Sequence, residues 1–273
     1  MNRYAVLCGN GRFPILALEQ AARLGHEVVA IGVKGEATKD IEPLARATYW
    51  ISIAELGKLI SICKDAAISQ LIFCGQVKHV SIFSNLKPDW RMFKLLTSLP
   101  ERNTDALIGG VIGVLAEEGI EVLDSTTLLK PLLAAEGPLT PRSPDSAEQK
   151  DIIYGRRIAA ALSGFDIGQS AAICERACVA VEAMEGTDAM LRRAASLVNG
   201  RRLTLVKGSR RRGHLLFDVP VAGPATIAAM NETGTTALAV DAGRTLLLDK
   251  DEMLSAAAQA GIAIAGYALE EGK

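Results

Sequence analysis

Residues 4–14, YAVLCGNGRFP, join an apolar strand to a helix through a turn with two glycines. Glycines let the backbone approach a ligand, and the helix N-terminus then offers N–H groups and a positive dipole end to phosphate. As a dinucleotide fingerprint the turn is defective, because Pro14 replaces the third glycine. The next strand, residues 27–33, also ends without the acid that would hold an adenosine ribose. The turn therefore favours a phosphate-bearing ligand over NAD, with a purely structural tight turn as the alternative.

Strands and helices alternate from this turn to residue 125. Apolar spacing predicts strands at 4–8, 27–33, 47–51, 69–74 and 120–123, and helices at 13–24, 53–64, 88–99 and 104–118. Alternation over short connections indicates a parallel sheet that is covered on both faces. We therefore expect an α/β protein whose N-terminal domain is a doubly wound, Rossmann-like parallel sheet.

The sequence changes character between residues 134 and 150, where three prolines occur without apolar periodicity. This segment is predicted to be a linker, with an ordinary surface loop as the alternative. Beyond it, the spacing predicts strands at 167–174, 177–183, 203–206, 215–217, 237–240, 245–248 and 263–267, and helices at 151–162, 187–198, 224–232 and 250–260. The first two strands are typical of a meander. We therefore expect a Rossmann-like domain at 1–133, a linker at 134–150 and a mixed-sheet α+β catalytic domain at 151–273.

The composition is that of a globular chain. Of the 273 residues, 49% are hydrophobic and 22% are charged, which excludes a disordered chain. A net charge of −1 disfavours a general nucleic-acid binder. No apolar run reaches the roughly 18 residues that span a bilayer, and the N-terminus lacks the apolar region of a signal peptide. Five cysteines without framework spacing indicate reduced thiols, so we expect a cytoplasmic protein.

Two further segments are candidates for phosphate and metal chemistry. Gly75 and Lys78 follow the strand at 69–74, and ligands of open α/β sheets gather at such strand ends. Lys78 is placed to meet a phosphate there, with a solvated loop lysine as the alternative. The segment 182–188 holds three carboxylates at a strand-to-helix turn. Mg²⁺ is commonly held by one or two carboxylates plus phosphate oxygens, while helix capping alone is the structural alternative.

The densest positive stretch runs from Lys207 to His214 and is followed by an acid, Asp218, between apolar residues. The basic loop is a solvated turn, a phosphate clamp or a contact for anionic lipid head groups. Asp218 is either a cap or a functional carboxylate, and its neighbours favour the second role. A serine hydrolase is disfavoured, because no G-x-S-x-G motif is present, and the Walker lysine loop is also missing.

Taken together, these motifs resemble the LpxI-type UDP-2,3-diacylglucosamine pyrophosphatase family of lipid A biosynthesis. The matching residues fall within 9–14, 25–28, 137–140, 151–152, 166–169, 182–188 and 217–226. The resemblance implies hydrolysis of UDP-2,3-diacylglucosamine to UMP and 2,3-diacylglucosamine 1-phosphate (lipid X). It also implies dependence on Mg²⁺, attack of water on the phosphorus nearer the sugar, and a ligand held between the two domains.

The resemblance also assigns site residues. The family's essential aspartate corresponds to Asp218, which we expect to bind the metal or to orient the water. Glu185 and Asp188 are the other expected catalytic carboxylates, and Asp188 is the second expected metal ligand. The expected substrate-binding residues are Gly9, Asn10, Gly11, Arg12, Gly75, Lys78, Thr140, Gln169, Thr187 and Lys207. The chain departs from the family at Gln76, where a glycine is usual, and at Lys78, where an arginine is usual.

A substrate with two acyl chains partitions into the inner leaflet, so peripheral contact with the inner membrane is expected. No nucleic-acid partner is expected, and homo-oligomerisation is left open. Two alternatives come from other functional classes. One is an NAD(P)-dependent oxidoreductase, which the opening turn suggests, and the other is a non-catalytic protein that binds a nucleotide sugar or a lipid.

Overall fold

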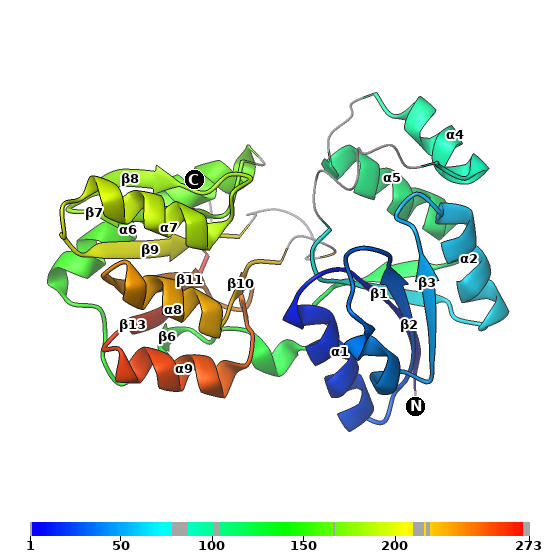
Figure 1. Cartoon of the computed structure of the whole chain (residues 1–273), viewed down its shortest axis with the longest axis horizontal. Helices are drawn as coiled ribbons and strands as arrows, with labels where there is room; N and C mark the ends of the chain where they lie inside the picture. Colours follow the sequence, from blue (N-terminus) through cyan, green and yellow to red (C-terminus); the bar gives the residue numbers. More distant parts are fainter. Residues whose placement is uncertain are drawn as a thin grey trace. The chain divides into compact units, whose positions relative to one another are not determined.

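The computed structural model describes residues 2–77, 87–100, 104–165, 167–209, 216 and 219–269. The chain divides into two compact units, Met1–Leu129 and Lys130–Lys273 (Figure 1). Each unit is built around its own sheet, in line with the expected α/β architecture of a parallel sheet followed by a mixed one.

The first unit is organised by a five-stranded sheet in the order β3-β2-β1-β4-β5. All the strand pairs are parallel. The strands are β1 (Arg3–Cys8), β2 (Glu27–Val33), β3 (Ala47–Ile51), β4 (Gln70–Cys74) and β5 (Glu121–Leu123). The strand order reverses between β1 and β4, and such a switch point is where open α/β sheets bind ligands.

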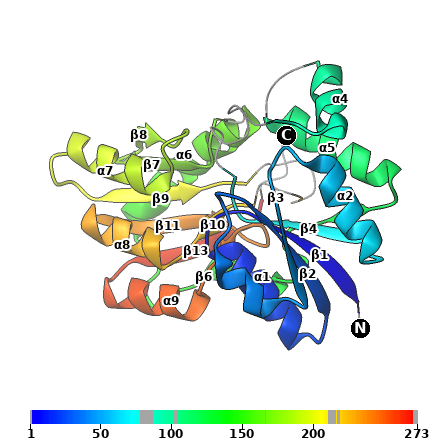
Figure 2. The same ribbon diagram turned by 45° about the vertical axis from the view of Figure 1, so that its right-hand side comes forward.

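Helices lie on both faces of this sheet (Figure 2). The described helices are α1 (Arg12–Arg23), the short 3₁₀ helix η1 (Lys39–Leu44), α2 (Leu56–Asp65), α4 (Trp90–Ser98) and α5 (Thr104–Glu117). Helices α2, α4 and α5 share one apolar core with the buried strand residues Ala5, Ile31 and Leu71. Helix α1 packs beside β1, β2 and η1. The alternation predicted from the sequence is confirmed, with helix ends that shift by up to three residues.

The second unit contains a six-stranded mixed sheet in the order β6-β13-β11-β9-β7-β8. These strands are β6 (Gly137–Pro138), β7 (Ser170–Cys174), β8 (Ala177–Val181), β9 (Leu203–Lys207), β11 (Thr235–Asp241) and β13 (Ala263–Tyr267). Strands β9, β11 and β13 are parallel, whereas β7 is antiparallel to both β8 and β9. A separate two-stranded sheet pairs β10 (Val221–Ala222) with β12 (Leu246–Leu247).

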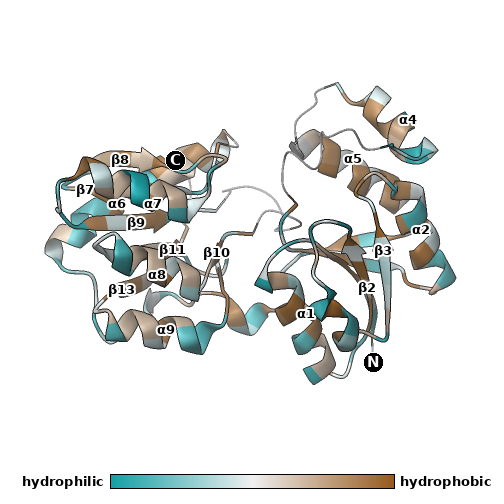
Figure 3. Cartoon of the chain, in the orientation of Figure 1, coloured by the Kyte–Doolittle hydropathy of each residue, from teal (hydrophilic) through white to brown (hydrophobic). Residues whose placement is uncertain are grey.

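The faces of this sheet carry two different cores. Helix α6 (Ser146–Gly164) packs against Ile173, Val206 and Ala239. Helices α7 (Thr187–Leu197), α8 (Pro224–Glu232) and α9 (Lys250–Gln259) share a core with Leu205 and Leu238 on the other face. Side chains alternate between the faces of a strand, which explains why Val206 and Leu205 enter different cores. Figure 3 shows brown, apolar colour along β8, β9 and β13, while the helices also carry teal residues.

The segment 134–150, expected to be a linker, contains regular structure that belongs to the second unit. Strand β6 pairs with β13, and helix α6 begins at Ser146, five residues before the expected start. Asp145 caps this helix: its Oδ1 accepts hydrogen bonds from the N–H groups of Ala147 (2.8 Å) and Glu148 (2.9 Å), and the Asp145 N–H donates in turn to Glu148 Oε2 at 2.8 Å. Such a capping box satisfies N–H groups that the helix itself cannot pair.

Two further points complete the comparison with the expected elements. The short strand expected at 215–217 falls largely outside the described residues, of which only Leu216 is included. Within the described ranges, the helices are all too short or too polar to span a membrane.

Candidate functional site

The two glycine turns of the first unit lie side by side at the switch point of its sheet. Asn10 and Gln76 form an antiparallel bridge, in which the Asn10 N–H donates to the Gln76 carbonyl at 2.7 Å and the Gln76 N–H donates back at 3.1 Å. The Gly9 N–H donates to the Cys74 carbonyl at 2.8 Å. The structure therefore brings Gly75 next to the turn formed by Gly9, Asn10 and Gly11, from which it is far separated in sequence.

Two of these glycines are required by the close approach of the turns. A Cβ on Gly9 would lie 2.6 Å from the Gln76 carbonyl oxygen. Gly75 has φ +89°, and a Cβ there would lie 2.7 Å from the Asn10 carbonyl oxygen. Helix α1 begins directly after Gly11, which has no side chain that could cap the helix. An anion at this edge of the sheet would therefore meet the N–H groups of the first turn of α1.

Arg12, the cation expected at this turn, has an acidic neighbour. Its Nη1 lies 3.2 Å from Glu19 Oε1, and the two residues form an exposed ion pair along the same helix, α1. An exposed pair of this kind contributes little to stability.

The second unit gathers polar side chains at one edge of its sheet. Strands β8, β9, β11 and β13 run in one direction, so their carboxyl ends share an edge with the amino end of the antiparallel β7. Lys207 is the last residue of β9, and its register partner is Ser170, the first residue of β7. Glu182 follows β8 directly, and its N–H donates to the Ser170 carbonyl at 2.9 Å. Sheet register alone therefore places these three residues together.

Their side chains form one buried cluster with Thr187, the first residue of α7. The Lys207 Nζ donates to Thr187 Oγ1 at 2.7 Å and to Ser170 Oγ at 3.2 Å. The Thr187 hydroxyl donates to Glu182 Oε1 at 3.0 Å, and Glu182 Oε2 lies 4.0 Å from the ammonium. The Lys207 side chain is only 7% exposed and that of Glu182 is 14% exposed. We call Ser170, Glu182, Thr187 and Lys207 the Lys207 cluster.

One feature of the cluster suits it to an anion with several oxygens, and a second calls for a hydrogen-bond donor. Helix α7 begins after Gly186 without any side-chain cap, so the N–H groups of its first turn are open to a ligand. Glu182 Oε2 is buried and has no hydrogen-bond partner among the described residues. Buried polar atoms are normally hydrogen-bonded, because leaving one unpaired destabilises the fold. This oxygen is therefore placed to accept a hydrogen bond from water or from a ligand hydroxyl.

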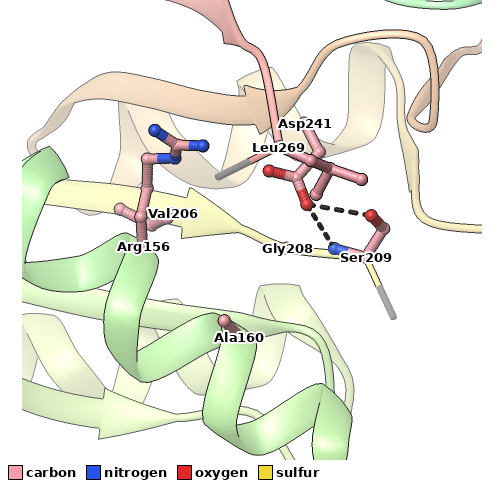
Figure 4. Close-up of a pocket in the computed structure, with 7 residues that line it drawn as sticks. All are labelled: Arg156, Ala160, Val206, Gly208, Ser209, Asp241 and Leu269. Atoms are coloured by element: carbon pink, nitrogen blue, oxygen red, sulfur yellow. Dashed lines mark hydrogen bonds between the residues drawn. The ribbon is translucent and has the colours of Figure 1, made fainter. Parts of the chain in front are cut away.

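A second polar group lies on the other face of the same edge (Figure 4). Asp241, the last residue of β11, is 7% exposed, and its Oδ2 accepts from the Ser209 N–H at 2.7 Å and from the Ser209 hydroxyl at 2.9 Å. With Arg156 and Ala160 of α6, these residues line a small hollow. Asp241 thereby fixes the position of Ser209, which immediately precedes the three arginines 210–212 of the basic stretch.

The predicted catalytic carboxylates Glu185, just before α7, and Asp188, in its first turn, make no hydrogen bond to the Lys207 cluster. Glu185 is tied to Arg193, whose Nη2 donates to Glu185 Oε1 at 2.6 Å. Hydrogen bonds from its own backbone N–H, from Arg193 and from the Ala183 N–H hold the pKa of the Glu185 carboxyl below its ordinary value. Asp188 is half-buried in the first turn of α7, and no hydrogen bond joins it to another described residue.

The other expected residues lie in different places. Gln169 precedes Ser170, and its carbonyl accepts from the Gly208 N–H at 2.8 Å. Thr140 is not brought to the cluster: its hydroxyl accepts from the N–H of Ile264, near the amino end of β13, at the opposite edge of the sheet. Lys78 and Asp218 lie outside the described residues.

The described carboxylates fit a magnesium site only if a ligand completes the shell of the ion. Within the described ranges, no group of three or more His, Cys, Asp or Glu side chains could hold a metal ion. Mg²⁺ normally needs only one or two carboxylates when phosphate oxygens and water complete its shell. Asp188 is suited to this role because its carboxylate makes no hydrogen bond to another described residue, whereas Glu182 already faces the Lys207 ammonium.

Sequence reasoning missed Ser170, Ser209 and Asp241 as site residues, and it included Glu182 only as part of the candidate metal segment 182–188. Asp241 and Ser170 had a usable signal, since each is a polar residue at the end of an apolar strand. Glu182 was visible as one of three nearby carboxylates, but only the strand register shows that it is the one next to Lys207.

Comparison with known proteins covers both units. The model of the LpxI N-terminal domain matches residues 3–132, and that of the LpxI C-terminal domain matches residues 135–265. A relative from Caulobacter vibrioides, named UDP-2,3-diacylglucosamine pyrophosphatase LpxI, is 30% identical over 281 residues, which cover 99% of each chain.

Solved structures give only weak likenesses. A UDP-glucose-4-epimerase from Stenotrophomonas maltophila is 17% identical, with 43% of this chain and 34% of that chain covered and a TM-score of 0.26. A phosphoribosylglycinamide synthetase from Anaerococcus prevotii is 14% identical, with 63% and 31% covered and a TM-score of 0.28. These scores are too low to carry an argument. The two domain models and the full-length relative confirm the resemblance found in the sequence: the chain belongs to the LpxI family.

Proposed function

We propose that this protein hydrolyses the diphosphate bond of UDP-2,3-diacylglucosamine to give UMP and lipid X, a step in lipid A biosynthesis. The family membership of both units and the name of the full-length relative support this activity. The structural observation that carries the proposal is the Lys207 cluster, a buried ammonium with two hydroxyls beside the open N-terminus of α7.

The cluster matches the chemistry of a diphosphate. A diphosphate resists attack because its negative oxygens repel an incoming nucleophile. Fixed donors around the phosphate stabilise the charge that builds up in the transition state, and they act more strongly where water is excluded. Lys207 and the first turn of α7 are such donors, and the hydrogen bond between Thr187 and Glu182 orients the Thr187 hydroxyl.

The reaction is written for attack at the phosphorus nearer the sugar. The oxygen of water forms a bond to that phosphorus, and the bond from the same phosphorus to the bridging oxygen breaks. The bridging oxygen leaves on UMP, and one proton of the water is released to the solvent. We assign the orientation of this water to Asp218, and the binding of the phosphates to Lys207 and Thr187.

We also propose that the reaction requires Mg²⁺, held by Asp188 and Asp218 together with phosphate oxygens. When bound, the metal would neutralise phosphate charge and polarise the P–O bonds. Peripheral contact with the inner membrane is part of the same proposal, because two acyl chains hold the substrate in the bilayer.

The test is a hydrolysis assay in water labelled with ¹⁸O. Purified protein is incubated with UDP-2,3-diacylglucosamine in the presence of Mg²⁺ or of EDTA. Release of UMP, with one ¹⁸O in the phosphate of lipid X, supports the proposal. Label in UMP would contradict attack nearer the sugar. Binding of the substrate without release of UMP would instead identify a non-catalytic binding protein, and equal rates with EDTA would refute the need for Mg²⁺.

A further inference from the structure

Helix α4 exposes two aromatic side chains that its core does not use. Met92 and Leu95 face inward and are 7% exposed, within the core shared with α2 and α5. Trp90 is 75% exposed and Phe93 is 48% exposed. Their rings stack on each other, with centroids 5.9 Å apart and an interplanar angle of 25°. Large aromatic side chains normally contribute most of their area to a core or an interface, so this pair calls for a partner.

The exposure is not the result of a loosely attached helix. Asp89 caps α4, because its Oδ1 accepts from the Met92 N–H at 2.9 Å. The other oxygen, Oδ2, accepts from the Gly57 N–H at the start of α2 at 2.6 Å. One carboxylate therefore ties two helix N-termini together, and the outer face of α4 has a fixed orientation.

The outer face of α4 is also positive. Lys94 is exposed and lies one helical turn after Trp90, and Lys87 is exposed just before the helix. No ion pair joins either lysine to another described residue. Arg91 and Lys64 both bind Glu118. Together, α4, the three residues before it and its ion-pair partners carry four cationic side chains but only two acidic ones, Asp89 and Glu118.

We propose that Trp90, Phe93 and Lys94, together with Lys87, form an interfacial anchor that inserts into the surface of an anionic phospholipid bilayer. Stacked aromatic rings are stable at the boundary between head groups and acyl chains, and lysines beside them attract anionic head groups. This inference builds on the proposed function, which requires access to a lipid substrate. A second copy of the chain fits the face less well, because two such faces would bring their cations together.

The two tryptophans of the chain make the proposal directly testable. Trp50 is half-buried, and its Nε1 donates to Glu42 Oε1 at 3.2 Å. The Trp50→Phe variant keeps only Trp90 as a fluorophore, and the Trp90→Phe variant keeps only Trp50. Both are mixed with vesicles of phosphatidylethanolamine and phosphatidylglycerol that carry brominated acyl chains and contain no substrate.

Quenching of Trp90 by the brominated chains, without quenching of Trp50, is the expected result. An unquenched Trp90, or equal quenching of both, would overturn the proposal. A change in Trp90 fluorescence with protein concentration in the absence of vesicles would also overturn it, in favour of self-association. If Trp50→Phe does not fold, the difference between the wild-type protein and Trp90→Phe gives the same information.

A pair of binding variants provides an independent check. Trp90→Ala/Phe93→Ala is expected to weaken vesicle binding at least about tenfold, given the area of two aromatic rings. The matched control is Leu24→Ala, which removes another exposed apolar side chain of the same unit, 52% exposed in the structure. Equal weakening by both variants would show a non-specific effect and contradict the anchor.

An activity measurement separates this inference from the proposed function. The Trp90→Ala/Phe93→Ala variant should release UMP at the wild-type rate when the substrate is dissolved in detergent micelles, and more slowly when it is embedded in vesicles. Equal rates of the two proteins on vesicles would contradict the anchor. If the wild-type protein releases no UMP in either form, the proposed function fails, while the quenching experiment still decides the anchor.

Discussion

Lys207 and Thr187, twenty residues apart in sequence, are joined by a 2.7 Å hydrogen bond between the Lys207 ammonium and the Thr187 hydroxyl. One residue ends β9 and the other begins α7, so the bond connects the carboxyl edge of the sheet to the open end of a helix. Both features attract anions. The bond therefore marks the position at which this unit is best equipped to hold a phosphate.

Replacing Lys207 should remove most of the proposed activity. Lys207→Met takes away the buried ammonium, and we expect UMP release to fall by about 10²–10³-fold, the range found for a lost transition-state donor. It also leaves Glu182 buried without its counter-charge, which destabilises a fold. The double variant Lys207→Met/Glu182→Gln is the control: thermal unfolding should show recovered stability, while activity stays low. Activity restored along with stability would contradict a direct role for Lys207.

The Thr187 hydroxyl should matter separately from its size. Thr187→Val keeps the shape but removes the group that links Lys207 to Glu182, and we expect kcat to fall about tenfold, or about 1.4 kcal/mol. Thr187→Ser keeps the hydroxyl and should retain most of the activity. Steady-state kinetics on both variants shows whether the size of the side chain or its hydroxyl matters. An equal loss of kcat in the two variants would indicate a packing role for Thr187 and contradict the hydrogen-bonding role.

The paired turns of the first unit should not tolerate a side chain at Gly75. Gly75→Ala would force a Cβ to within 2.7 Å of the Asn10 carbonyl oxygen at φ +89°, and we expect it to lower the free energy of unfolding by about 1–3 kcal/mol. Gly113→Ala in α5 is the matched control, because a Cβ there meets nothing within 4 Å. It should leave stability unchanged or raise it by about 0.5–1 kcal/mol. Denaturant unfolding of both variants provides the measurement.

The pH dependence of stability should reveal Glu148, which lies 1% exposed at the start of α6. Burial raises the pKa of its carboxyl, but hydrogen bonds from Arg142, Thr236 and the Asp145 N–H outweigh burial and leave the pKa below its ordinary value of 4.5. A lowered folded-state pKa stabilises the protein above pH 4.5, and this contribution is lost as the pH falls through the folded value.

Glu148→Gln should therefore destabilise the protein at pH 7 by about 1–2 kcal/mol, the scale of a charged hydrogen bond whose other partner, Arg142, is partly exposed. The difference from wild type should shrink as the pH falls below 4.5. Urea unfolding at a series of pH values measures it, and a difference that does not change with pH would show that the ionised carboxylate is not the stabilising group.

The folds of both units could be predicted because their strands are short apolar runs that alternate with amphipathic helices. The early start of α6 was missed, since the prolines of 134–150 obscured a capping box formed by Asp145 and Glu148. In the site, no sequence spacing could show that Asn10 and Gln76 would pair, because their contact depends on the strand order β1-β4.

The carboxylates of 182–188 illustrate the same limit. Glu182 faces Lys207 because β8 and β7 are in register, whereas Glu185 pairs with Arg193, which lies in α7 eight residues further along the chain. From their spacing in the sequence alone, Glu182 and Glu185 are equally good candidates for a site carboxylate. Which carboxylate enters the site is decided by strand pairing and by competing cations, and neither is visible in a single sequence.

Cleavage of the diphosphate can be followed directly by ³¹P NMR, with the purified protein, Mg²⁺ and UDP-2,3-diacylglucosamine in detergent micelles. The account predicts that the two diphosphate resonances of the substrate are replaced by two monophosphate resonances, and that Asp218→Ala binds the substrate without this change. Diphosphate resonances that persist while the wild-type protein binds the substrate would contradict the central claim.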